Sequence, residues 1–91
     1  MTDIRAQLLQ ILAVLERHPD IKVIGTNTGT MPSVHTASLA PLMAAYPAVA
    51  VRPEPTVHGL FRYMTIDGVE FCDLIRFTNE QLSTLAAGVL A

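Results

Sequence analysis

The stretch GLFRYMTIDGVEFCDLIRF, Gly59 to Phe77, decides how this chain folds. It divides into two apolar runs around the dipeptide Asp67-Gly68, which suits the type I′ turn that two-residue β-hairpins favour. Such a turn fixes the pairing of the flanking strands, so Ile66 is expected to face Val69 and every later pair follows in step. The sequence therefore predicts a long antiparallel hairpin.

The predicted register divides the hairpin side chains between two faces. The first face holds the pairs Ile66 with Val69, Met64 with Phe71, Arg62 with Asp73, and Leu60 with Ile75. The second holds Thr65 with Glu70, Tyr63 with Cys72, Phe61 with Leu74, and Gly59 with Arg76. Opposite charges meet at Arg62 and Asp73, which supports this register, because a slip of one residue would separate them and exchange the faces.

The two faces are expected to have different neighbours. The first is richer in aliphatic side chains, and we predict that helices cover it. The second has an apolar and aromatic centre inside a polar rim, as protein interfaces do; the centre is Phe61, Tyr63, Cys72 and Leu74. Three short helices are few to cover both faces, so we expect another molecule on the second. A further helix of the same chain is the alternative, and a reversed assignment of the faces also stays open.

The rest of the chain predicts short helices and strands. Thr2 or Asp3 can cap a helix that ends near Arg17, before Pro19. Strands are predicted over 21–26 and 48–55, the latter ended by Pro53 and Pro55. Residues 30–37 form either a second strand, limited to a sheet edge by Pro32, or an ordered loop. Short helices are predicted over 38–46 and from residue 79, the second after a capping box at 78–81.

These elements predict one α+β domain over residues 1–91. Its sheet is expected to be mainly antiparallel, with about three to five strands. The N-terminal and C-terminal helices are expected to pack on one face of that sheet. No repeat, linker or low-complexity tract divides the chain.

Composition favours association over other partner classes. Hydrophobic residues make up 51% of the 91 residues and charged residues 15%, against about 25% charged in typical domains. A domain this small hides that much apolar surface poorly. A net charge of −2 argues against nucleic-acid binding, and no apolar run is long enough to span a bilayer. We therefore expect a cytoplasmic homodimer that binds neither nucleic acid nor membrane.

No group of residues predicts catalysis, a cofactor or a metal site. Cys72, His58 and Asp73 are the types found in thiol enzymes, but Cys72 and Asp73 should point to opposite faces of one strand. The three histidines, His18, His35 and His58, lack the spacing of metal ligands. The single cysteine also excludes an internal disulfide.

Two functional hypotheses remain. The first is a non-enzymatic interaction module that dimerises through its sheet. One version of this hypothesis is a phage or mobile-element accessory protein that binds a host protein. The second is a small-ligand or enzymatic domain that uses the segment Gly25–Thr36 together with His35 and His58. In that segment the candidate ligand or partner residues are Thr26, Asn27, Thr28, Thr30 and His35.

Overall fold

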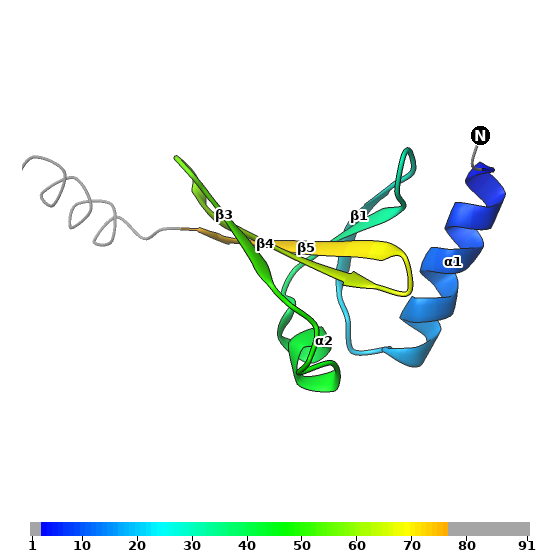
Figure 1. Cartoon of the computed structure of the whole chain (residues 1–91), viewed down its shortest axis with the longest axis horizontal. Coiled ribbons are helices and arrows are strands. Elements are labelled where there is room, and N and C mark those ends of the chain that lie inside the picture. The colour runs from blue at the N-terminus through cyan, green and yellow to red at the C-terminus, as the bar shows by residue number, and fades with distance from the viewer. Residues whose placement is uncertain (1–2, 77–91) are drawn as a thin grey trace, which may run out of the picture.

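The computed structural model describes residues 3–76, in which two helices pack with a five-stranded mixed sheet in an α+β arrangement (Figure 1). Its elements are α1 (Ile4–Arg17), β1 (Val23–Asn27), β2 (Ser33–Thr36), α2 (Ala40–Ala45), β3 (Arg52–Thr56), β4 (Gly59–Ile66) and β5 (Val69–Arg76). The strand order is β1-β2-β5-β4-β3. Three of the pairings are antiparallel, and β2 pairs with β5 in parallel. The predicted fold class is thus confirmed, whereas the predicted C-terminal helix lies outside the described residues.

The hairpin of β4 and β5 follows the predicted register over its full length. Ile66 pairs with Val69, Arg62 with Asp73, and the last pair is Gly59 with Arg76. Asp67 and Gly68 have φ values of 51° and 78°, and a type I′ turn requires positive φ at both central positions. The dipeptide Asp67-Gly68 therefore sets the geometry that the sequence predicted.

The helix α1 closes the end of the sheet where the β4–β5 turn lies. It begins after Asp3, whose carboxylate accepts a hydrogen bond from the Arg5 backbone N–H at 3.1 Å. The buried side chain of Gln7 accepts from the Gly29 N–H and donates to the Gly29 carbonyl, at 3.0 and 2.6 Å. Gln10 donates to the Asp67 carbonyl at 2.8 Å. Two glutamines thus attach α1 to the β1–β2 loop and to the β4–β5 turn.

The core lies between the two described helices and one face of the sheet. It includes Ile11 and Val14 of α1, Leu42 of α2, and Leu39 just before α2. The sheet contributes Val34, Met64, Ile66, Val69 and Phe71. The hairpin residues among them all belong to the aliphatic face, so helices cover that face near the β4–β5 turn, as predicted. At the other end of the same face Leu60 is half-buried and Ile75 is 44% exposed. We call this side of the sheet the inner face.

The edge strand β3 corrects one prediction. Pro53 and Pro55 do not end the strand but lie within it, paired with Arg62 and Leu60. In an antiparallel strand alternate residues direct their amides toward the partner. Proline has no N–H. Hydrogen bonding between β3 and β4 is therefore possible only if both prolines occupy positions where the backbone nitrogen points away from β4. The outer edge of β3 therefore offers no donor at those two positions.

The position of β2 corrects a second prediction. Residues 33–36 do form a strand paired with β1, but β2 lies inside the sheet, between β1 and β5. Pro32 precedes the strand, and its carbonyl accepts a hydrogen bond from the Glu70 N–H at 2.9 Å. Pro32 therefore does not restrict β2 to an edge, and His35 lies on an interior strand.

Candidate interaction surface

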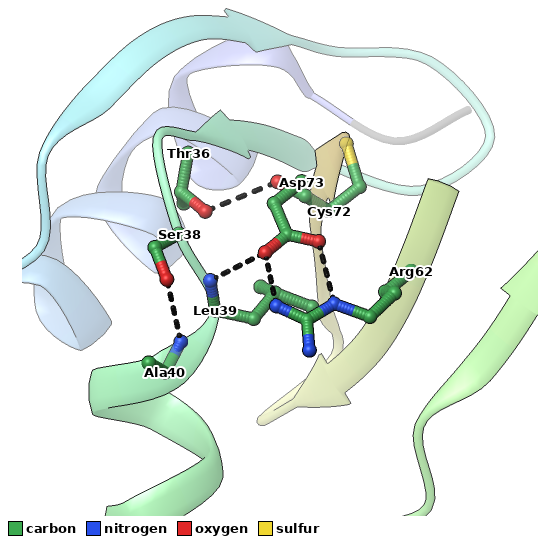
Figure 2. A network of polar contacts seen from close by, with 7 residues as sticks. All are labelled: Thr36, Ser38, Leu39, Ala40, Arg62, Cys72 and Asp73. Carbon is green, nitrogen blue, oxygen red and sulfur yellow. Dashed lines mark hydrogen bonds and ion pairs between the residues drawn. The ribbon is translucent and has the colours of Figure 1, made fainter. Parts of the chain in front are cut away.

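The polar pair of the inner face is satisfied within the chain. Asp73 is 2% exposed and accepts two hydrogen bonds from the Arg62 guanidinium, at 2.6 and 3.0 Å. Its carboxylate also accepts from the Leu39 N–H at 2.8 Å (Figure 2). Leu39 is the N-cap residue of α2 and offers no side-chain cap, so Asp73 supplies an acceptor at this helix start. The pair therefore lies under α2, and the reversed assignment of the faces is wrong.

These hydrogen bonds determine the charge state of Asp73. Burial by itself raises the pKa of this carboxyl, but the hydrogen bonds from Arg62 and from Leu39 outweigh burial and lower the pKa below 3.8. Asp73 is therefore ionised at neutral pH. Figure 2 also shows Thr36, whose hydroxyl donates to the Cys72 carbonyl at 3.1 Å and joins β2 to β5.

The opposite side of the sheet, which we call the outer face, has no cover from α1 or α2. It is defined by side chains of β2, β4 and β5: His35, Phe61, Tyr63, Thr65, Glu70, Cys72 and Leu74. Thr65 is exposed and the other six are half-buried. The rings of Phe61 and Tyr63 stack with centroids 6.2 Å apart, and His35 tilts against Phe61 at 6.4 Å. The outer face thus has a continuous aromatic centre.

Charged groups border this aromatic centre. The Arg52 guanidinium carbon lies 5.5 Å from the centroid of the Tyr63 ring, and Arg52 pairs with Glu70 at 2.8 Å. Burial raises the pKa of the Tyr63 hydroxyl, and the carboxylates of Glu54 and Glu70 raise it further. Arg76 is exposed at the end of β5. The apolar centre is therefore bordered by the Arg52–Glu70 pair beside Tyr63 and by Arg76 at the end of β5.

Cys72 lies in this centre, and its thiol is protonated at neutral pH. Burial raises its pKa, and the carboxylates of Glu70 and Asp73 raise it further. Asp73 points to the inner face, as predicted, and His58 lies in the β3–β4 turn. His58 is five residues along the sheet from Tyr63, the partner of Cys72, which is about 16 Å at the rise of a strand. The three residues do not form a catalytic group.

A small pocket adjoins the aromatic centre. Its volume is about 280 Å³, and its lining residues are Gly25, Thr26, Asn27, Ser33, His35 and Cys72. The pocket gathers three predicted ligand residues, Thr26, Asn27 and His35, whereas Thr28 and Thr30 do not line it. His35 and Cys72 meet there because they pair across β2 and β5. The contact between His35 and Cys72 was not predicted from the sequence, because no local signal indicates that β2 pairs in parallel with β5.

Searches against family models, curated proteins and solved structures find no match to this chain. Among residues 3–76, no three side chains of His, Cys, Asp and Glu are grouped so that they could hold a metal ion. In the same part of the chain, no helix is both long and apolar enough to cross a membrane.

Proposed function

We propose that this chain is a non-enzymatic protein-interaction module that associates through its outer face, in the first instance with a second copy of itself. The observation that supports the proposal is the aromatic centre of Phe61, Tyr63, Cys72 and Leu74, which neither described helix covers. Aromatic side chains in a partly desolvated centre are the usual source of binding energy in protein interfaces. A symmetric dimer is the commonest assembly that buries such a surface.

The test is the molar mass of the full-length chain at about 10 µM, a concentration that populates dimers of micromolar affinity. We expect the wild type to be a dimer and Phe61→Glu and Leu74→Glu to be folded monomers, because each places a charge in the apolar centre. Val57→Glu is the matched control: it adds the same charge at a side chain that is 83% exposed in the β3–β4 turn. This control should stay dimeric.

Two results would reject the proposal. One is a wild type that is monomeric at about 10 µM. The other is that both charged variants lose their circular-dichroism signal while Val57→Glu keeps it, which would place the outer face in the core of a single chain. A third result would change the partner. If the wild type forms complexes only with another protein, such as a host protein, and the folded charged variants do not, that protein is the occupant of the outer face.

The pocket favours a second candidate, the binding of a small polar ligand. It offers hydroxyl and amide groups from Thr26, Asn27 and Ser33 beside the His35 ring. Of its six lining residues only His35 and Cys72 are of the types that serve as acids, bases or nucleophiles, and an enzyme needs several such groups that converge. His58, the other histidine of this hypothesis, is too distant to contribute. We therefore rank the pocket below the outer face.

A further inference from the structure

The helix α1 has a second apolar side that its own sheet does not use. Gln7, Ile11 and Val14 face the core, whereas Leu9 and Leu12 are 66% and 49% exposed. Leu8, at 47% exposed, lies at the border between the two sides, and Ile4, at 60% exposed, lies on the core side seven residues before Ile11. At 3.6 residues per turn, Leu9 and Leu12 lie roughly opposite the buried residues. The helix therefore presents leucines to solvent on the side that faces away from the domain.

Two opposite charges flank these leucines in a regular pattern. Arg5, Leu9, Leu12 and Glu16 follow one another at spacings of four, three and four residues, the spacing of a helical packing stripe. We call these four residues the α1 stripe. Because the spacings read the same in both directions, an antiparallel copy that sets Arg5 against Glu16 also sets Leu9 against Leu12. The stripe is thus complementary to itself.

The two charges have no stabilising partner within their own helix. None of the ion pairs formed among residues 3–76 includes Arg5 or Glu16. Their described neighbours at three and four positions along the helix are Leu8, Leu9, Leu12 and Ala13. A cation in the first turn and an anion in the last also oppose the helix dipole. An ion pair with another molecule accounts for a placement that the helix itself disfavours.

We propose that the α1 stripe is a second self-association surface, on which α1 packs antiparallel against α1 of another copy. Leu9 and Leu12 form the centre, and two symmetric ion pairs join Arg5 of each copy to Glu16 of the other. This surface is independent of the outer face. A single helix pair is smaller than a standard interface, so we expect it to form at higher concentration, between about 100 µM and 1 mM.

The test is sedimentation equilibrium of the full-length Phe61→Glu chain at up to about 1 mM, which reports dissociation constants of that size. In this background we expect a dimer. Arg5→Glu and Glu16→Arg should each raise the dissociation constant at least about tenfold, because like charges then meet at both ends of the stripe. The double change R5E/E16R should restore the dimer. Lys22→Glu, which alters the net charge as R5E does at an exposed residue beyond α1, should have no effect.

The charge reversals also separate loss of contact from loss of folding. An acidic first turn and a basic last turn favour the helix dipole, so each single variant should stay folded. If the Phe61→Glu chain is monomeric at about 1 mM, the inference is wrong. So would single variants that associate as well as the background, or a double variant that fails to recover. If the wild type proves monomeric at low concentration and the outer face is rejected, the same series in the wild type still tests the α1 stripe.

Discussion

The inner and outer faces of the β4–β5 hairpin look alike in sequence but differ in how they are completed. On the inner face the hydrophobic residues from Met64 to Phe71 are buried beneath α1 or α2, and the Arg62–Asp73 pair has its partners within the chain. Beyond that pair, Leu60 is half-buried and Ile75 is exposed. On the outer face Phe61, Tyr63 and Leu74 are only half-buried. Apolar composition therefore does not show by itself which side of a sheet is the core.

The inner face should bear the larger share of the folding free energy. Phe71 is fully buried, so Phe71→Ala should lower the free energy of unfolding by about 3–5 kcal/mol. Leu74→Ala, a substitution on the outer side of the same strand, should cost under about 1.5 kcal/mol, since the side chain is already partly in water. Urea denaturation at about 1 µM, where association contributes least, measures both. Equal losses would remove the distinction between the faces.

Acid should weaken the inner face through Asp73. The pKa of this carboxyl is lowered in the folded state from its ordinary value of 3.8. Its stabilising effect is therefore fully present above that value and is lost as the pH falls through the lowered pKa. Asp73→Asn should cost about 2 kcal/mol at pH 7 and should flatten the fall in stability below about pH 4. An unchanged acid profile in this variant would show that other carboxylates determine it.

The rim of the outer face should have the smallest effect on folding. Arg52 has a side chain that is 65% exposed, although it contacts both Tyr63 and Glu70. Arg52→Ala should change the free energy of unfolding by less than about 1 kcal/mol, as for other exposed ion pairs. Thermal denaturation of the two proteins side by side measures the difference. A larger loss would mean that the rim helps to hold β3 on the sheet.

Local signals in the sequence predicted the parts of the fold that depend on neighbouring residues. Asp67-Gly68 fixed the register of the hairpin, and Asp3 with Pro19 bounded α1. The pairing of β2 with β5 could not be predicted, because strands separated by more than thirty residues are matched only by the packed core. For the same reason His35 was not expected beside Cys72.

The candidate surface was predicted only as far as the hairpin register extends. Its centre follows from the alternation of Phe61, Tyr63, Cys72 and Leu74. The contribution of Arg52 depends on β3, whose two prolines were interpreted as ending the strand. Prolines at alternate positions are compatible with an edge strand, and this rule could have located β3.

The reactivity of Cys72 tests most directly whether another molecule covers the outer face. Cys72 lies in the centre of that face and is the only cysteine in the chain, so its rate of labelling by a thiol reagent at fixed pH reports on the unaltered protein. We predict a rate that falls as the protein concentration rises through the range in which the dimer forms. A rate that does not depend on concentration would contradict the account: a slow rate would mean a cover from the same chain, and a fast one no cover.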